Sequence, residues 1–258
     1  MEISLSGRAA VVTGGSKGIG FAVAKEFAAS GADVAIVARN EEALREAVAA
    51  IRHATQTRVI GVQADVSKAA DLQRAYDEVM SAFDKVDIVV NNAGTSRAMP
   101  FEQLTDQILY DDLELKLFAA LRLIRLVIPQ MKERRWGRIL NVLNIGAKAP
   151  RPNSMPTSIS RGAGMAMTKA LSHELAPHNV LVNAMLVGII RADQHVQRAK
   201  RTNVPIEEYY DAHGKQIPIG RAGEAAEFAN LACVLVSEQG SYITGTAINV
   251  DGGRSPVV

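Results

Sequence analysis

The feature that most constrains the fold is a glycine-rich turn between an apolar run and a helical pattern. The apolar run is Ala9 to Val12, the turn reads TGGSKGIG, and the helical pattern extends from Ile19 to Ser30. A strand that turns through glycines into a helix presents backbone N–H groups and the positive end of the helix dipole, which together bind a pyrophosphate. The alternative is a tight turn without a ligand. The residues predicted to contact a dinucleotide here are Thr13, Gly14, Ser16, Lys17, Gly18, Ile19 and Gly20.

Strand-like and helix-like runs alternate along the chain. This alternation predicts one doubly wound α/β domain over residues 1–258, with a parallel sheet covered by helices on both faces. The strands are almost continuously apolar, as expected when both faces are buried. The expected strands are Ala9–Thr13, Val34–Ala38, Arg58–Gln63, Ile88–Asn91, Arg138–Val142, Val180–Met185 and Ala247–Val250.

A long polar stretch at about 189–220 interrupts this alternation. It carries His195, Tyr209, Tyr210 and His213. A long insertion after a strand's carboxyl end favours a lid over a site. The two tyrosines and two histidines are therefore candidates to reach a ligand.

Composition excludes several classes of protein. The formal net charge of the 258-residue chain is +2, and its cations are dispersed, which argues against nucleic acid as the main partner. The longest apolar stretch, Leu113 to Met131, contains four charged residues, so no membrane span is expected. The first residues, MEISLSGR, do not resemble a signal peptide, so a cytoplasmic protein is expected. Cys233 is expected in the core, and no metal-ligand spacing occurs.

The end of the second expected strand indicates which dinucleotide is bound. In dinucleotide-binding folds an acid here contacts the adenosine ribose, whereas an arginine accommodates a 2′-phosphate. The acid position holds Ala38, Arg39 follows it, and Lys17 adds a second cation from the glycine turn. These residues favour NADP(H) over NAD(H), the alternative being that both are solvated surface cations.

Two further turns follow strands at the same edge. Asp65 and Val66 end the third strand, and Ser67 is expected to cap the next helix. Asp65 is either a turn residue or a contact to the adenine amino group, and Val66 is an expected cofactor contact. The turn NNAG follows the fourth strand and lets the backbone approach a ligand closely, although turn chemistry alone would also explain it. Its expected cofactor contacts are Asn91, Ala93 and Gly94.

The motifs TGGSKGIG, ADV and NNAG, in this order, resemble the short-chain dehydrogenase/reductase family. The resemblance continues through GRILNV, TKALSHELAP, VNA and GTAINVDGG. It implies one Rossmann-type domain with seven parallel strands and a bound NAD(P)(H), contacted also by Gly188 and Ile190. It further implies a homodimer or homotetramer, built from about Asp106–Lys132, Ser160–Leu175 and Ala247–Val250.

The family's chemistry uses an asparagine, a serine, and the tyrosine and lysine of a YxxxK motif. Counting from the flanking motifs, the resemblance places these four positions at Lys116, Asn144, Thr157 and Arg161. The proton-donating tyrosine is thus replaced by threonine, whose hydroxyl is a far weaker acid than a phenol. Arg161 retains a positive charge and donors for ribose hydroxyls, and Asn144 retains a donor for a carbonyl oxygen.

Three functions are compatible with these replacements. The first is an NADPH-dependent reductase of a carbonyl substrate, with Lys116 as proton donor, Asn144 and Arg161 polarising the carbonyl, and Tyr209 or Tyr210 as an outside candidate donor. The second is a dinucleotide-binding sensor or partner subunit without turnover. The third is different chemistry on an anionic ligand held between Lys116 and Arg161.

Overall fold

The computed structural model describes residues 3–258, and within these residues seven parallel strands form one sheet. The strand order is β3-β2-β1-β4-β6-β8-β9, so the chain reverses direction across the sheet between β1 and β4. Ligands of open parallel sheets bind at the carboxyl ends of the strands beside such a reversal. The strands are β1 (Ala9–Thr13), β2 (Asp33–Ala38), β3 (Val59–Gln63), β4 (Ile88–Asn91), β6 (Gly137–Asn144), β8 (Val180–Val187) and β9 (Ala247–Val250).

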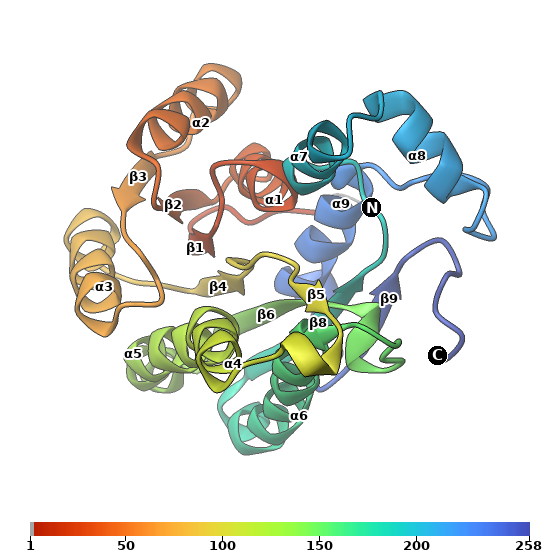
Figure 1. The fold of residues 1–258 in the computed structure, drawn as a ribbon. Helices are drawn as coiled ribbons and strands as arrows, with labels where there is room; N and C mark the ends of the chain where they lie inside the picture. The colour runs from red at the N-terminus through yellow and green to blue at the C-terminus, as the bar shows by residue number, and fades with distance from the viewer. Residues whose placement is uncertain (1–2) are drawn as a thin grey trace.

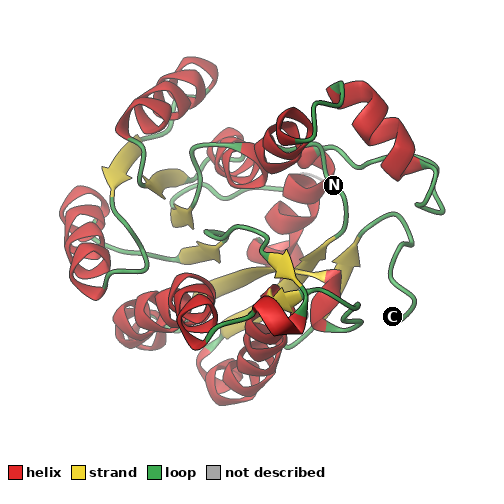
Figure 2. Cartoon of the chain, viewed as in Figure 1, coloured by secondary structure: helices red, strands yellow, loops and turns green. Residues whose placement is uncertain are grey.

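Helices cover both faces of the sheet (Figures 1 and 2). One buried apolar cluster joins the sheet to α1 (Gly18–Ala29), α2 (Glu41–Ala54) and α9 (Ala225–Val236). A second cluster joins the opposite face to α3 (Ala69–Phe83), α5 (Ala119–Glu133) and α6 (Thr157–Leu175). Burial on both faces explains why the strands are apolar almost throughout.

Short elements connect the large ones at the carboxyl edge. The chain between β4 and α5 passes through β5 (Ala98–Met99), η1 (Phe101–Gln103), α4 (Asp106–Leu113) and the π-helical turn η2 (Glu114–Phe118). After β6 come η3 (Ile145–Ala147) and β7 (Met155–Pro156), and β5 and β7 pair as a two-stranded antiparallel ribbon. The turns η4 (Ala176–His178) and η5 (Glu238–Gly240) follow α6 and α9 and lie at the opposite, amino edge of the sheet.

The 189–220 segment contains α7 (Asp193–Arg201) and α8 (Ile206–Gly214). A small apolar cluster of its own, which includes Tyr209, Tyr210 and Ile217, holds these helices together. In Figure 1 α7 lies beside α1, and α8 lies farther out at the edge of the molecule.

The predicted fold class is confirmed, and each expected strand is present with bounds that differ by at most a few residues. Cys233 is buried on α9, as expected. Among the described residues, no helix combines the length and the apolar character that crossing a bilayer requires.

Candidate functional site

The glycine turn is fixed to the end of β4 by a set of hydrogen bonds. The Thr13 hydroxyl donates to the carbonyl of Val90 and accepts from the backbone N–H groups of Asn92 and Ala93. The Asn92 amide donates to the carbonyls of Thr13 and Gly14. These bonds join the two loops that flank the reversal between β1 and β4.

The turn lacks room for side chains at its glycines. A Cβ on Gly14 would lie 3.0 Å from Ala93 Cα, and a Cβ on Gly20 would overlap Asn92 Nδ2 and the Gly14 carbonyl. Within the described structure, the N-cap of α1, Lys17, makes no side-chain capping bond to the first N–H groups of the helix. A bare backbone cradle at a helix N-terminus fits a pyrophosphate, so these residues suit a dinucleotide.

Lys17 and Arg39 are both exposed, and neither has a carboxylate within ion-pair distance among residues 3–258. Both cations therefore lack a protein counter-charge.

The loop after β3 departs from expectation, because the residue that precedes α3 is Lys68, and Ser67 does not cap this helix. Instead, Asp65 Oδ1 accepts bonds from the backbone N–H and hydroxyl of Ser67, which is the turn role for Asp65.

Lys116 is the centre of a buried polar network. Its Nζ donates to Asp112 Oδ1 at 2.6 Å and to Thr157 Oγ1 at 2.8 Å. The Ser160 hydroxyl donates to the other carboxylate oxygen of Asp112 at 2.7 Å. Thr157 Oγ1 also accepts the backbone N–H of Arg97 at 3.0 Å. The structure thus brings together Lys116 and Thr157, two residues predicted from the sequence.

Local structure explains how the network forms. Lys116 lies in η2, between α4 and α5, and such π-helical turns are frequent at functional sites. Asp112 lies one turn earlier, and Thr157 and Ser160 share one face of the first turn of α6. The packing of η2 against α6 therefore sets the network's geometry.

The electrostatic environment lowers the pKa of Lys116. Burial, followed by the positive charge of Arg161, lowers this pKa from 10.5 to about 8, although Asp112 opposes the shift. Burial also lowers the pKa of Arg161, to about 10. Lys116 is therefore a group that exchanges a proton near physiological pH.

Arg161 approaches the turn after β4. Its guanidinium donates to the carbonyl of Val142 at 2.9 Å, and a Cβ on Gly94 would lie 2.7 Å from Arg161 Nη2 and 3.3 Å from Lys116 Cγ. No carboxylate of the described chain lies within 4 Å of this guanidinium. Gly94 thus leaves space for two cationic side chains.

Asn144 ends β6 at the same edge of the sheet, opposite Val187 of β8. Its Oδ1 is buried and has no hydrogen-bond partner within residues 3–258. A buried amide oxygen without a partner is uncommon and indicates a bound ligand or water at that position.

A small cavity of about 10 Å³, close to the space that one water needs, lies beside Lys116. Several residues predicted from separate motifs meet around it. Its lining consists of Thr13, Val66, Asn91, Ala93, Leu115, Lys116, Ala119 and Ala120.

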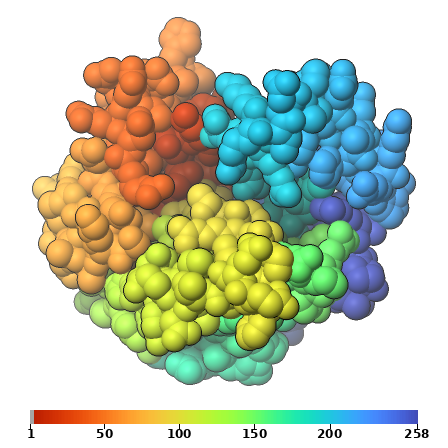
Figure 3. Space-filling view, in the orientation of Figure 1, coloured from red at the N-terminus to blue at the C-terminus, as the bar shows by residue number. Residues whose placement is uncertain are grey.

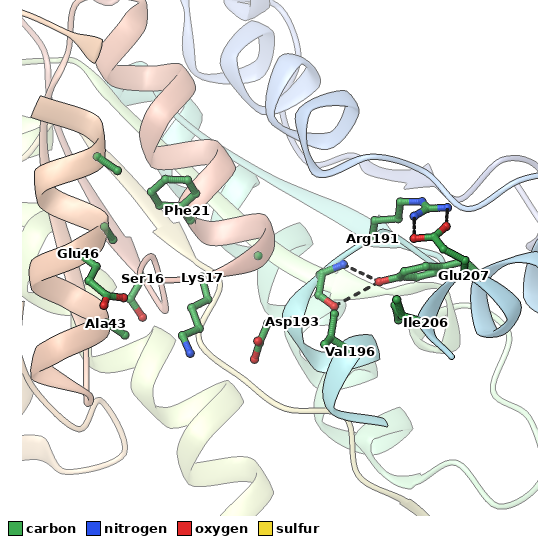
Figure 4. Close-up of a pocket in the computed structure, with 15 residues that line it drawn as sticks. Ser16, Lys17, Phe21, Ala43, Glu46, Arg191, Asp193, Val196, Ile206 and Glu207 are labelled. Atoms are coloured by element: carbon green, nitrogen blue, oxygen red, sulfur yellow. Dashed lines mark hydrogen bonds and ion pairs between the residues drawn. The ribbon is translucent and has the colours of Figure 1, made fainter. Parts of the chain in front are cut away.

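A larger cleft of about 670 Å³ opens between α2 and the 189–220 segment, with the glycine turn at its floor (Figures 3 and 4). Ser16, Lys17 and Gly18 line this cleft. Opposite them, Arg191 forms a bidentate ion pair with Glu207.

The tyrosines of the 189–220 segment lie inside it. The Tyr209 hydroxyl bonds to His195 Nδ1 at 3.1 Å, and the Tyr210 hydroxyl accepts the backbone N–H of Ala192 at 3.1 Å. His213 Nδ1 lies 2.7 Å from the Tyr209 carbonyl. The prediction that Tyr209 or Tyr210 reaches in from the segment as a proton donor was wrong, because both side chains are buried in the segment's own cluster, although Tyr210 also lines the larger cleft.

The remaining predicted cofactor residues follow β8. The backbone N–H of Gly188 donates to Val250, and a Cβ on Gly188 would lie 2.6 Å from Asp251 Cβ. The side chain of Ile190 is buried in the core beside α1 and α9, so only its backbone is available to a cofactor.

The sequence analysis did not identify Asn92, which joins the glycine turn to the end of β4. It also did not identify Asp112, Ser160 and Arg97, which belong to the hydrogen-bond network of Lys116. Asn92 was available as the second residue of NNAG. Asp112 and Ser160 carried only a weak signal, namely helical spacings of four from Lys116 and three from Thr157.

Comparisons with known proteins agree with this geometry. The family model described as "Enoyl-(Acyl carrier protein) reductase" matches residues 14–255. The 3-oxoacyl-[acyl-carrier-protein] reductase FabG of Aquifex aeolicus is 33% identical over 98% of this chain and 99% of its own. A 3alpha-hydroxysteroid dehydrogenase of Mediterraneibacter gnavus is 30% identical over 98% of both chains.

A solved structure is similar over the full length. L-sorbose reductase from Gluconobacter frateurii, complexed with NADPH and L-sorbose, superimposes with a TM-score of 0.96 and is 32% identical, with complete coverage of both chains. Because family model, curated relatives and solved structure all span nearly the whole chain, the protein belongs to the short-chain dehydrogenase/reductase family of oxidoreductases.

Proposed function

We propose that the protein is an NADP(H)-dependent reductase of carbonyl compounds in which Lys116 supplies the proton. The single observation that carries the proposal is the buried ammonium of Lys116, held between Asp112 and Thr157. The reaction needs an acid near the carbonyl oxygen, and a lysine with a pKa of about 8 is such an acid. The reduced nicotinamide supplies the hydride when it is bound.

The chain's other residues have separate roles in this proposal. The glycine turn and the N-terminus of α1 hold the pyrophosphate, and Lys17 and Arg39 contact the 2′-phosphate. Arg161 contacts the nicotinamide ribose from its place against Gly94. Asn144 donates its amide to the carbonyl oxygen and polarises it. NADPH in the L-sorbose reductase structure and the reductase names of the relatives support the cofactor and the reaction class.

The first experiment is calorimetric titration of the purified protein with NADPH and with NADH. We expect binding of NADPH and much weaker binding of NADH. A panel that includes ketoses such as L-sorbose and 3-oxoacyl thioesters is then assayed for NADPH oxidation. Failure to bind either nucleotide contradicts the proposal. NADPH binding without turnover on any carbonyl favours the sensor function instead.

Lys116→Met tests the proton donor. We expect turnover to be lost while NADPH affinity stays within about twofold. This variant leaves the buried Asp112 carboxylate without its counter-charge, which costs about 3–5 kcal/mol of stability. The double variant Lys116→Met/Asp112→Asn removes that unpaired charge and serves as the folded control. Unaltered turnover in either protein would remove Lys116 from the mechanism.

A second candidate function is supported by Arg161. Its guanidinium makes one hydrogen bond and has no carboxylate within 4 Å in the described chain, and its positive charge contributes to lowering the pKa of the neighbouring Lys116. Lys116 and Arg161 are two positive charges beside one carboxylate, that of Asp112, so a carboxylate or phosphate ligand would balance the second charge. Inhibition of NADPH oxidation by small carboxylates, and calorimetric binding of the same compounds, would distinguish an anionic ligand from a neutral carbonyl.

A further inference from the structure

The Lys116 ammonium is enclosed more completely than a direct proton donor to a substrate should be. The exposed fraction of its side chain is 0%, and that of Asp112 is 1%. Thr157 is buried beside the ammonium, and its Oγ1 accepts a hydrogen bond from Nζ at 2.8 Å. The Thr157 hydroxyl is therefore a group through which the Lys116 proton can reach a substrate oxygen without direct contact at Nζ.

The hydrogen bonds at Thr157 leave its own proton free. A threonine hydroxyl has one donor and two acceptor lone pairs. The lone pairs of Thr157 Oγ1 accept from Lys116 Nζ and from the backbone N–H of Arg97. No acceptor for the O–H of Thr157 is present among residues 3–258, so this bond is available to a ligand.

Asp112 fixes the other end of the chain of hydrogen bonds. One carboxylate oxygen accepts from Lys116 and the other from Ser160, so both oxygens are held in place. A carboxylate held in this way orients Nζ toward Thr157 and stabilises the charged ammonium.

We propose that Thr157 is a catalytic residue that conducts the proton of Lys116 to the substrate, and that Asp112 is the residue that positions Lys116 for this transfer. The inference rests on the reductase function proposed above and adds the route of the proton to it. It does not require threonine to act as an acid by itself.

The transfer balances in protons and electrons. The carbonyl carbon accepts the hydride and its oxygen takes the proton of the Thr157 hydroxyl. In the same step Thr157 Oγ1 takes a proton from Lys116 Nζ, so threonine is regenerated and no free threonine alkoxide forms. Lys116 ends the step neutral beside the Asp112 carboxylate and regains its proton from solvent between turnovers.

The test compares Thr157→Val, which removes the hydroxyl at similar shape, with Thr157→Ser, which keeps it. Loss of a proton-transfer group lowers rates by about 10²–10⁴-fold. We expect this loss of kcat in Thr157→Val, a loss of less than about tenfold in Thr157→Ser, and NADPH affinity within about twofold of wild type in both. Thr57→Val, far from the site, is the matched control. Wild-type turnover by Thr157→Val would overturn the relay while leaving the reductase function standing.

The number of protons that move in the transition state is an independent test of the relay. Rates measured in mixtures of H₂O and D₂O should curve with the deuterium fraction in the wild type, because two protons move together. A straight line, which indicates one moving proton, would overturn the relay.

A titration that needs no substrate distinguishes failure of the Thr157 relay from failure of the reductase function. NMR of ¹³Cε-labelled lysine, assigned with Lys116→Met, follows Lys116 directly. We expect the titration midpoint to shift downward in both Asp112→Asn and Thr157→Val. An unshifted midpoint in both variants would overturn the hydrogen-bonded chain itself. Absence of wild-type turnover, with the shifts present, would overturn the reductase function and with it the catalytic role of the chain.

Discussion

Lys116 Nζ and Asp112 Oδ1 lie 2.6 Å apart, and both side chains are almost fully buried. Removing two charges from water carries a free-energy cost that their mutual attraction often fails to recover, so such pairs are poor evidence of selection for stability. This pair lies at the carboxyl edge of the sheet, beside the turn after β4. A role in moving protons explains its location better than a role in holding the fold.

The pH dependence of turnover should report the protonation of Lys116. Carbonyl reduction requires the ammonium form, which predominates below the pKa of about 8. We therefore expect kcat to be level below pH 8 and to fall about tenfold per pH unit well above it. Steady-state rates at saturating NADPH between pH 6 and 10 would show this limb.

Asp112→Asn should shift the falling part of the pH dependence of kcat to lower pH. The Asp112 charge raises the pKa of Lys116, so its removal lowers that pKa and shifts the falling limb to lower pH. Asp112→Glu keeps the charge and is expected to restore the limb partly. If the limb stays at its wild-type position in Asp112→Asn, another group titrates.

The preference for NADPH over NADH should depend on Lys17 and Arg39, which have no protein counter-charge. Lys17→Ala and Arg39→Ala should each raise the Kd of NADPH by about tenfold or more, since each loses a charge-assisted bond to the 2′-phosphate. The Kd of NADH should change less than about twofold. Arg45→Ala on the exposed face of α2 removes the same charge and is the control. Equal weakening of both nucleotides would place the two cations elsewhere on the cofactor.

The sequence predicted the sheet well because its strands report two-sided burial directly. Runs such as Val34–Ala38 are apolar throughout, and only a central parallel strand buries both faces. The glycine turn was equally informative, because Gly20 leaves no space for a Cβ against Asn92. Local steric requirements of this kind are present in the sequence itself.

The buried network could be predicted only in part. Lys116 and Thr157 were identified by counting along motifs, whereas Asp112 and Ser160 look like ordinary polar residues of helical surfaces. Their roles arise from the packing of η2 against α6, which brings together residues 48 positions apart. Tyr210 was misjudged for the converse reason, since its hydroxyl is used by the backbone of its own segment.

The glycine turn should not tolerate even a methyl group at position 20. In Gly20→Ala the new Cβ would overlap the Gly14 carbonyl and Asn92 Nδ2, so the turn must shift and its N–H groups lose alignment with a pyrophosphate. We expect NADPH affinity to fall by about tenfold or more and unfolding stability by about 1–3 kcal/mol. Calorimetry and denaturant unfolding measure the two effects.

Gly162→Ala is the matched control for that substitution. Gly162 lies inside α6 with no atom within 4 Å of the added Cβ. Alanine in an open helical position should stabilise the protein by about 0.5–1 kcal/mol and leave NADPH affinity unchanged. A similar loss of affinity in both variants would mean that the effect at position 20 is not local.

Acid should weaken the 189–220 segment through His195. Burial, then the charges of His213, Arg198 and Arg254, lowers its pKa from 6.5 to about 4. Between these pH values the unfolded chain binds a proton that the folded chain does not, so stability falls as the pH drops from 6.5 to 4. The loss is about 2 kcal/mol once solvent screening is allowed for. His195→Gln should flatten this slope in urea unfolding, whereas the exposed His53→Gln should not. Parallel slopes in all three proteins would show that His195 is not the group responsible.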